Sequence, residues 1–477
     1  MEILEDETRL AVEQALKSGA EYVEARAQRD VGHTLTLNNG VAEPVTTTRR
    51  LGVGIRVIVD GSMGFASTNN LESSQIRTSA ETAVRIAKAA VRLISAPSKL
   101  APERSWEDKW EARMKIDIQQ VSIKEKFDEL FSIERALSFD HVKVSLPSRI
   151  LVLDDELTEK FYRNSEGSKL QGFVPRISLF FILTGEEKGK GTIQRMRHEA
   201  QTRGWEAVKE WNASAIATDE ATMLGRMLRD RTHPPREEVD LVLGSEVTGI
   251  ICHESCGHPQ EADRILGREG AQAGESYVKR DMLGKRIGSE HVTIIDDPTL
   301  PDSYGFYQYD DEGVKARPRT LIKDGVISDL LHNRETAAEF GVSSNAAARS
   351  VAYDREPIIR MANTYMKPGE YTLDELVEDV KSGVYMKSFM EWNIDDRRYN
   401  QRYVGLEAYA IRNGEIGAPV RNPILEVTTP GLYGRVDAVG KLVEYSGATC
   451  GKGDPQQGAA VWTGGPPIRI RKIRVGG

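Results

Sequence analysis

The sequence has very few cysteines. Only Cys252, Cys256 and Cys450 occur in 477 residues, and the first two are four positions apart. An odd number of cysteines with this spacing does not form a disulfide framework, and it is typical of proteins kept in a reducing compartment. We therefore expect a cytoplasmic protein.

Long apolar runs and an excess of basic charge are also absent. No apolar run approaches the ~18 residues that a membrane span needs. The N-terminal stretch MEILEDETRLAVEQ is acidic, whereas a secretory signal has a basic start and an apolar block. The net charge is −8 and is spread along the chain, which favours solubility and gives no reason to expect a nucleic-acid partner. We expect neither a membrane nor a nucleic acid as a partner.

The length of the chain predicts more than one domain, because 477 residues exceed one ordinary core. The N-terminal part alternates helical and strand patterns in an order that indicates an α+β layer rather than βαβ repetition. We expect residues 1–235 to form an α+β domain with an antiparallel sheet and helices. The Pro-Pro pair at 234–235 marks the boundary. Residues 236–477 then form a strand-rich C-terminal domain that carries a short HExxxH helix.

Local patterns predict individual elements. Apolar spacing predicts helices over 5–18, 71–95 and near 217–229, and Asn-Gly and Asp-Gly pairs mark two hairpins. The polar stretch 96–112 reads as a connection, whereas RISLFFILTG and GTIQRMRHEAQT read as strands. TLDE at 372–375 is a capping box that predicts a helix. The tail PPIRIRKIRV reads as a strand with a bulge or an end at Lys472.

The stretch ICHESCGHPQEADRI, residues 251–265, gathers groups that can hold a metal. A hydrolytic zinc site needs about three protein ligands and one open position for water. Imidazole and thiolate both suit zinc, and a nearby carboxylate that is not a ligand can take a proton from water. His253 and His258 offer two ligands and Glu254 offers the base. The alternative is a buried helix start whose histidines make local hydrogen bonds.

The spacing of the two histidines places a condition on the zinc interpretation. In H-E-x-x-H the histidines lie ~40° apart around a regular helix, whereas five positions separate them by ~140°. They can share a metal only if the helix is locally wider or breaks, which Gly257 or a π-type bulge would allow. The zinc interpretation therefore predicts a distorted helix at 254–258. The residues leave the third ligand open among His291, His332, acidic residues and Cys450.

Several blocks of the sequence resemble the TldD/PmbA family of zinc-dependent peptidases. HESCGHPQEAD resembles its H-E-x-x-G-H-x-x-E-x-D motif, and DDEGVKARPRTLIKDGVISD its DDEG turn and hairpin. RMANTYMKPGE resembles its R-M-x-N-T-Y-x-x-P-G block. ATCGKGDPQQGAAVWTGGPPIRIRKIRVGG is similar to its terminal block, although DPQQGAA replaces a simpler spacing after the cysteine. The N-terminal GVGIRVIVDGSMGFAST fits as well.

The resemblance implies a site and an activity. It implies that His253, His258 and Cys450 hold Zn²⁺ with Glu254 as general base, as in the metal-bearing, TldD-like subunits. It implies hydrolysis of short or unfolded peptides in a site enclosed at a subunit interface. The partner would be a second copy or a metal-free PmbA/TldE-like paralogue.

Neighbouring residues have alternative roles. Glu261 and Asp263 could orient a histidine ligand or lie on a solvated face. Asn363, Thr364 and Tyr365 are candidate contacts to a peptide. Cys256 reads as a packing residue, and Asp310, Asp311 and Glu312 as a turn with Gly313.

Three other functions compete with the peptidase. One is a nucleic-acid regulator, for which the sequence offers neither a basic patch nor a reading helix. A non-catalytic structural or regulatory subunit of a TldD/PmbA-type complex would have no use for Glu254, because a structural zinc closes with four ligands. A redox protein based on Cys252 and Cys256 would need C-x-x-C spacing rather than C-x-x-x-C.

Overall fold

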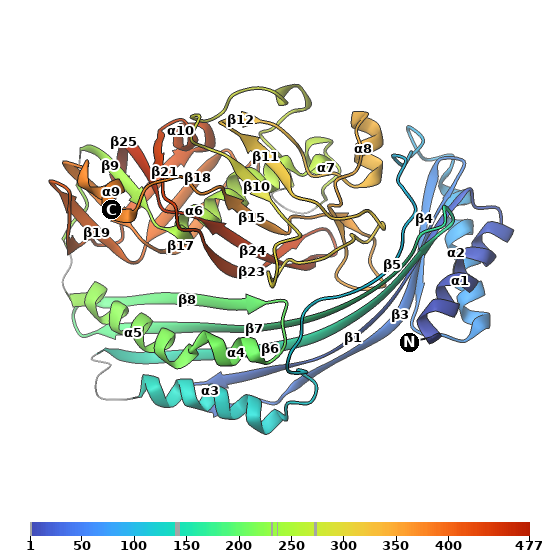
Figure 1. Ribbon diagram of the computed structural model, residues 1–477, viewed down its shortest axis with the longest axis horizontal. Helices are drawn as coiled ribbons and strands as arrows, with labels where there is room; N and C mark the ends of the chain where they lie inside the picture. Colours follow the sequence, from blue (N-terminus) through green and yellow to red (C-terminus); the bar gives the residue numbers. More distant parts are fainter. Residues whose placement is uncertain (1, 139–143, 230–231, 236, 271–273) are drawn as a thin grey trace.

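The computed structural model describes residues 2–138, 144–229, 232–235, 237–270 and 274–477. A long curved sheet forms the N-terminal half, and a strand-rich half packs along its inner side (Figure 1). This agrees with the α+β class expected from the sequence. Residue 236, where we expected the second domain to begin, lies outside the described residues, so the boundary at 234–235 stays a prediction. No helix in the described ranges is both long and apolar enough to cross a membrane.

The N-terminal half is built on one eight-stranded sheet. Its order is β4-β3-β1-β6-β7-β5, with β2 added to β1 and β8 to β7. Both predicted hairpin turns are present, at 39–40 between β1 and β2 and at 60–61 between β3 and β4. The strands are β1 (Tyr22–Asn38), β2 (Val41–Ala42), β3 (Thr46–Val59), β4 (Ser62–Thr68), β5 (Glu107–Glu111), β6 (Ser145–Asn164), β7 (Lys169–Glu187) and β8 (Gly191–Gln201).

Strand β5 corrects the expectation for 96–112, which we read as an irregular connection. EDKWE is polar, yet it pairs in parallel with β7, while the other strand pairs of this sheet are antiparallel. Trp110 is its anchor, because its ring lies against Gly172, where any Cβ would approach it to 2.7 Å. Because β5 is anchored by this single aromatic contact, its sequence does not show the alternation of apolar and polar residues that would have predicted a strand.

Helices cover the two ends of this sheet (Figure 1). The helices α1 (Glu2–Lys17) and α2 (Ser73–Ala90) pack at one end through small residues such as Ala11, Ala80 and Ala83, which are fully buried. The helices α3 (Ile123–Leu137), α4 (Glu206–Trp211) and α5 (Ala213–Arg229) cover the other end. The three predicted helices are confirmed as α1, α2 and α5.

The C-terminal half contains a six-stranded and a nine-stranded sheet. The first has the order β12-β11-β10-β15-β24-β23, and the second β17-β18-β21-β25-β9-β16-β19-β20 with β22 added to β25. The six-stranded sheet and the small β13–β14 pair comprise β10 (Ile294–Asp296), β11 (Arg319–Lys323), β12 (Val326–Ile327), β13 (Ala348–Arg349), β14 (Ile358–Ile359), β15 (Asn363–Met366), β23 (Glu444–Lys452) and β24 (Gln457–Gly465). The nine-stranded sheet comprises β9 (Glu238–Leu243), β16 (Ser382–Met386), β17 (Phe389–Ile394), β18 (Asn400–Gly405), β19 (Ala408–Arg412), β20 (Glu415–Pro419), β21 (Ile424–Thr428), β22 (Val436–Val439) and β25 (Ile468–Gly476).

Short helices connect these strands. They are α6 (Ser245–Cys252), the π-helical η1 (His253–Gly257), the 3₁₀ turns η2 (His258–Gln260) and η3 (Arg280–Met282), α7 (Ala262–Ile265), α8 (Arg334–Phe340), α9 (Leu373–Glu378) and α10 (Thr429–Tyr433). The capping box of α9 is confirmed by reciprocal bonds between Thr372 and Glu375. The irregularity predicted at Lys472 is confirmed too, because the register of β25 shifts between Ile470 and Ile473 and Lys472 has φ 51°.

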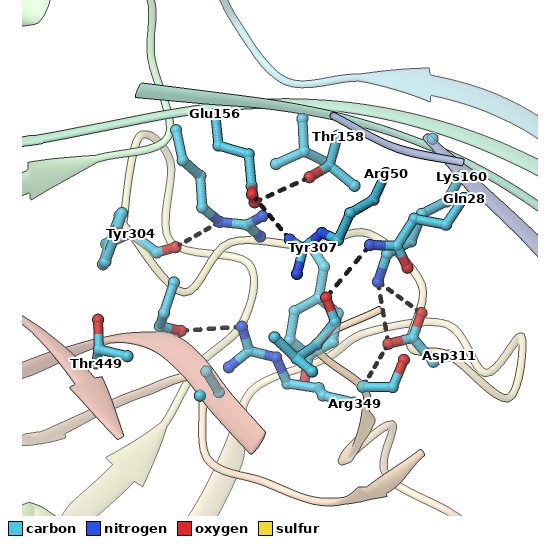
Figure 2. A pocket seen from close by; sticks show the side chains of 18 of the residues that line it. Gln28, Arg50, Glu156, Thr158, Lys160, Tyr304, Tyr307, Asp311, Arg349 and Thr449 are labelled. Atoms are coloured by element: carbon cyan, nitrogen blue, oxygen red, sulfur yellow. Dashed lines mark hydrogen bonds and ion pairs between the residues drawn. The ribbon is translucent and has the colours of Figure 1, made fainter. Parts of the chain in front are cut away.

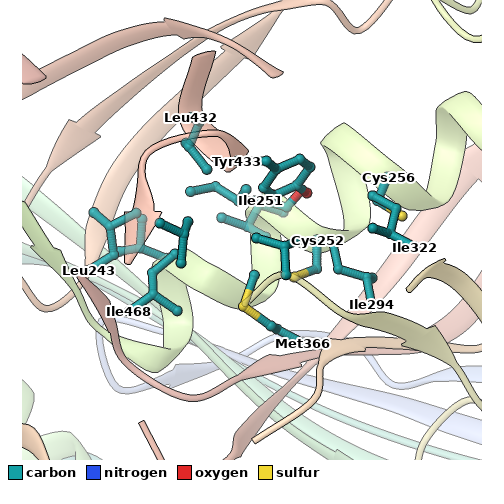
Figure 3. Close-up of a cluster of buried hydrophobic side chains, with 14 of the residues drawn as sticks. Leu243, Ile251, Cys252, Cys256, Ile294, Ile322, Met366, Leu432, Tyr433 and Ile468 are labelled. Carbon is teal, nitrogen blue, oxygen red and sulfur yellow. The ribbon is translucent and has the colours of Figure 1, made fainter. Parts of the chain in front are cut away.

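Helix α6 lies inside the apolar core of the C-terminal half (Figure 3). Cys252, at the end of α6, and Cys256, in η1, are both buried in this core. Ile251, Ile294 and Met366 belong to the same cluster. Burial raises the pKa of both thiols well above the ordinary value. Cys256 therefore sits where a packing residue belongs, and neither thiol has the lowered pKa of a redox cysteine.

The two halves meet around a cavity of about 310 Å³ (Figure 2). The predicted turn at 310–313 lies here, and Gly313 adopts φ 75° with its N–H donating to the Asp310 carbonyl. Its carboxylates reach across to the sheet, where Asp311 pairs with Lys160 at 2.8 Å and Glu312 with Arg56 at 2.6 Å. The turn therefore joins the halves. The candidate metal ligands do not line this cavity.

Candidate metal centre

The HESCGH segment forms one turn of π-helix at the end of α6, which confirms the distortion predicted at 254–258. The His258 N–H donates to the His253 carbonyl, five residues back, instead of four as in an α-helix. This wider turn brings residues five apart onto one side. The two imidazole rings consequently lie with centroids 4.9 Å apart and planes at 81°.

Gly257 is needed for space rather than for its backbone freedom. Its φ of −55° is an ordinary right-handed helical value, so the chain does not break at this residue as we had considered. A Cβ at this position would approach the Met361 sulfur to 1.9 Å. The glycine thus lets the π-turn pack directly against the strand-rich core.

Gly257→Ala is expected to destabilise the protein by about 1–3 kcal/mol, because the added methyl group overpacks a closed site. Urea denaturation measures the change. Gly270→Ala is the matched control, since none of the described residues beyond its chain neighbours has an atom within 4 Å of a Cβ built there. Equal stability of the two variants would contradict the close packing of the π-turn.

Cys450 approaches the two histidines from the far end of the chain. It lies on β23 opposite Ala459 of β24, and its Sγ is 3.2 Å from His258 Nε2. One ligand atom each from His253, His258 and Cys450 lies within 4.8 Å of the others. Burial alone would raise the pKa of the Cys450 thiol, but His258 and Arg360 outweigh it and lower the pKa to about 7. This thiol is the one of the three that reaches the thiolate form near neutral pH.

The histidines offer nitrogen atoms suited to a metal. His258 Nδ1 is bound to Glu261 Oε2 at 3.0 Å, so Nε2 is the nitrogen left facing the sulfur. His253 Nδ1 is buried and has no hydrogen-bond partner among the described residues. Two imidazoles and one thiolate are a donor set that zinc accepts, and three ligands leave a position open. The residues present therefore fit zinc.

A buried ionic network fixes the orientation of His258. Glu261 is fully buried and contacts Arg264 Nε at 2.5 Å and Lys452 Nζ at 3.2 Å. Burial raises the pKa of Glu261, but Lys452, His258 and Arg264 outweigh it and hold the pKa well below the ordinary value. Asp263 instead binds Lys452 at 2.7 Å. Of the two acidic residues considered for orienting a histidine ligand, Glu261 is the one that contacts a histidine.

Glu261→Gln is expected to weaken zinc binding by about 10–100-fold, because the residue behind a ligand sets its tautomer and basicity. Competition against a chromophoric chelator measures the affinity. Asp263→Asn is the control, since Asp263 touches Lys452 but neither histidine. Equal losses in both variants would mean that the network acts on the fold rather than on His258.

Glu254 lies beside the ligands and forms a buried ion pair with Arg398. Trp392 also lies close enough to this carboxylate to help lower its pKa. Burial alone would raise the pKa of Glu254, but Arg398, together with His258, His253 and Trp392, holds the pKa below the ordinary value. The carboxylate is therefore ionised, as a proton acceptor must be.

The candidate peptide contacts Asn363, Thr364 and Tyr365 lie on β15, which is paired on both sides, with β10 and β24. Asn363 and Thr364 are fully buried. Asn363 donates to the Asp297 carbonyl and to Ser303, and Thr364 donates to Asp296. Tyr365 is only partly buried, and its ring meets Tyr445 edge to face. Contact of these residues with a substrate stays a prediction. Tyr365 is the strongest candidate, because it is the only one of the three that is partly exposed.

Sequence reasoning missed Arg398, Trp392, Lys452 and Arg264. Arg264 follows the HExxxH segment closely and could have been suspected. Trp392 and Arg398 come from β17 and the turn after it, 144 positions from Glu254 in the case of Arg398. No local pattern connects segments this far apart.

Comparisons with known proteins find similar sequences along most of the chain. Three models of the PmbA/TldA metallopeptidase match the chain: domain 1 at residues 23–90, the central domain at 116–232 and the C-terminal domain at 236–477. A metalloprotease of Methanothermobacter thermautotrophicus is 32% identical over 97% of both chains. A zinc metalloprotease TldD homolog of Saccharolobus solfataricus is 28% identical over 98% of this chain and 99% of its own.

Solved structures share the fold. A proposed modulator of a DNA gyrase from Thermotoga maritima superposes with a TM-score of 0.79 at 18% identity, covering 99% of both chains. TldE from Thermococcus kodakarensis gives a TM-score of 0.73 at 18% identity, covering 99% of this chain and 100% of its own.

Proposed function

The chain belongs to the PmbA/TldA metallopeptidase family, and on this premise we propose that it is a zinc-dependent peptidase acting on short or unfolded peptides. The observation that carries the proposal is the convergence of His253, His258 and Cys450 beside the ionised Glu254. A purely structural zinc site has no use for an adjacent carboxylate that is not a ligand.

The proposed ligands are His253, His258 through Nε2 and Cys450 through Sγ. A bound zinc ion would supply a Lewis acid that polarises the peptide carbonyl and makes water more acidic. Glu261 keeps the proton of His258 on Nδ1, which leaves the lone pair of Nε2 available to a metal. Arg360 holds the Cys450 carbonyl, and β24 pairs with the strand that presents the sulfur.

Glu254 is the proposed general base. Its carboxylate takes a proton from the attacking water and later gives it to the leaving amine. The ion pair with Arg398 holds the same carboxylate beside the ligands. Because the site is nearly closed to solvent, these electrostatic contacts act in a low dielectric.

Strand β17 is the proposed place for an extended peptide. Among the described residues β17 pairs only with β18, which makes it an edge of the nine-stranded sheet. It also carries Trp392, which helps to lower the pKa of Glu254, so the strand passes near the proposed base. Backbone pairing along such an edge recognises extended peptides with little side-chain selectivity. Tyr365 is a further proposed contact.

Zinc removal and reconstitution test the proposal. A mixture of unstructured peptides is incubated with chelator-treated and zinc-reloaded protein, and products are identified by mass spectrometry. We expect cleavage only after zinc is restored, with Cys256→Ser as a control thiol that keeps both zinc and activity. Cleavage that survives complete zinc removal would contradict the proposal.

The proposed working unit is a dimer, either of two copies or with a metal-free TldE-like paralogue. The fold shared with a solved TldE chain favours an assembly of related subunits. Light scattering of the purified protein distinguishes a homodimer from a monomer that awaits a paralogue. If the zinc-loaded dimer binds peptides without cleaving them, the alternative role as a non-catalytic regulatory subunit replaces the peptidase.

A further inference from the structure

We propose that Arg398 binds a free carboxylate of the peptide substrate, and that this carboxylate takes over the ion-pair position of Glu254. The inference rests on the proposed function, because it assigns a substrate class to the same site. It concerns peptides that carry an α-carboxylate or an acidic side chain close to the bond that is cleaved.

The Arg398–Glu254 ion pair is secluded from solvent. The side chains are 13% and 11% exposed, and Glu254 is the one carboxylate that pairs with Arg398 among the described residues. The guanidinium also has a buried Nε–H without an acceptor. Arg398 therefore has donors to spare on the side that Glu254 does not occupy.

The backbone beneath Arg398 is rigidly held. Arg398 adopts φ 60°, and its N–H donates to the Asp395 carbonyl at 2.9 Å, closing a tight turn after β17. Its carbonyl accepts from Thr429 Oγ1 at 3.1 Å. The guanidinium is therefore presented from a fixed base, and only its side chain can change partner.

Tyr277 ties this turn to the metal centre. Its N–H donates to the Arg397 carbonyl at 2.8 Å, and its hydroxyl donates to the Ser255 carbonyl at 3.2 Å inside the π-turn. Its ring also meets Tyr399 edge to face. The position of Arg398 relative to His253 and His258 is thus set by direct contacts rather than by a free loop.

Charge balance explains why the incoming group should be an anion. The carboxylates of Glu261 and Asp263 are already paired with Arg264 and Lys452, so they do not neutralise Arg398. When Glu254 turns away from Arg398 toward a water molecule, Arg398 loses its partner inside a nearly closed site, which is strongly unfavourable. A substrate carboxylate can replace Glu254 with paired N–H···O bonds, whereas a neutral carbonyl cannot restore the charge balance.

Peptide binding tests this inference without relying on hydrolysis. Zinc-loaded Glu254→Gln protein is titrated by calorimetry with two matched pairs: a tripeptide as free acid or C-terminal amide, and an amidated tripeptide with glutamate or glutamine. We expect at least one acidic member to bind about tenfold or more tightly than its neutral match. The pair that shows the difference identifies the source of the carboxylate.

Variants of the turn locate the effect. In the Glu254→Gln background, Arg398→Met should abolish the preference for the acid, and Arg398→Lys should keep part of it. Arg397→Met is the control, because Arg397 is the exposed neighbour that pairs with Glu275. Equal binding of acid and neutral peptides, or a preference that survives Arg398→Met, would overturn the inference. Absence of hydrolysis by the wild-type protein would overturn only the proposed function.

Discussion

Glu254→Gln is expected to lower peptide hydrolysis by about 10²–10⁴-fold, the usual contribution of a positioned general base. The glutamine amide has nearly the same shape but cannot accept the proton from water. The three ligand atoms come from other side chains, so zinc should remain bound at one ion per chain. The variant separates the chemical step from metal binding.

Turnover of a quenched-fluorescence peptide and zinc analysis by mass spectrometry measure both quantities on one sample. Glu275→Gln is the matched control, because this carboxylate lies in the neighbouring loop and is largely exposed. We expect it to leave rate and zinc content unchanged. Full activity of Glu254→Gln would remove Glu254 from the mechanism, whereas loss of zinc would make it a ligand.

Cys450→Ser is the second change with a large expected effect. A serine hydroxyl is not ionised near neutral pH, so the site would lose its anionic donor and keep two imidazoles. We expect zinc affinity to fall by more than the ~10–100-fold typical of a residue behind a ligand. Activity at limiting zinc should fall in parallel.

Chelator competition measures the zinc affinity, with Cys256→Ser as the control. Cys256 is only two positions from Glu254 but points into the apolar core, and burial holds its pKa well above the ordinary value. Cys256→Ser should therefore lower the stability of the protein and leave its zinc affinity unchanged. A larger zinc loss in Cys256→Ser than in Cys450→Ser would reverse the assignment of the thiols.

Local chemistry made parts of the fold predictable. The capping box at Thr372 and Glu375, the hairpin glycines and the slip at Lys472 each depend on a few adjacent residues, and the structure confirms them. The π-turn was predictable for the same reason. Two histidines five apart can share a metal only if the helix is widened or broken between them, which is a condition internal to the segment.

Other features depend on contacts between distant segments. Strand β5 is polar and is held by Trp110 over Gly172. Pairing partners such as β5 and β7 were therefore less accessible than elements with local signals. Helix α3 is a different kind of miss, because its cap, in which Ser122 accepts from the Glu125 N–H, is a local signal that was overlooked.

The third ligand shows the same limit. From the residues alone His291, His332 and Cys450 remained equivalent, and only the resemblance to a family singled out Cys450. The structure places His291 on the surface and bonds His332 to Thr336, whereas Cys450 meets His258. Closing a loop of 192 residues is decided by the whole fold. Arg398 escaped notice for the same reason.

X-ray absorption at the zinc edge of the reloaded protein tests the central claim most directly. Coordination by His253, His258 and Cys450 predicts one sulfur at about 2.3 Å and two imidazole nitrogens at about 2.0–2.1 Å, with a light atom completing the shell. The sulfur signal should disappear in Cys450→Ser and persist in Cys256→Ser. A shell of nitrogen and oxygen alone in the unaltered protein would contradict the account.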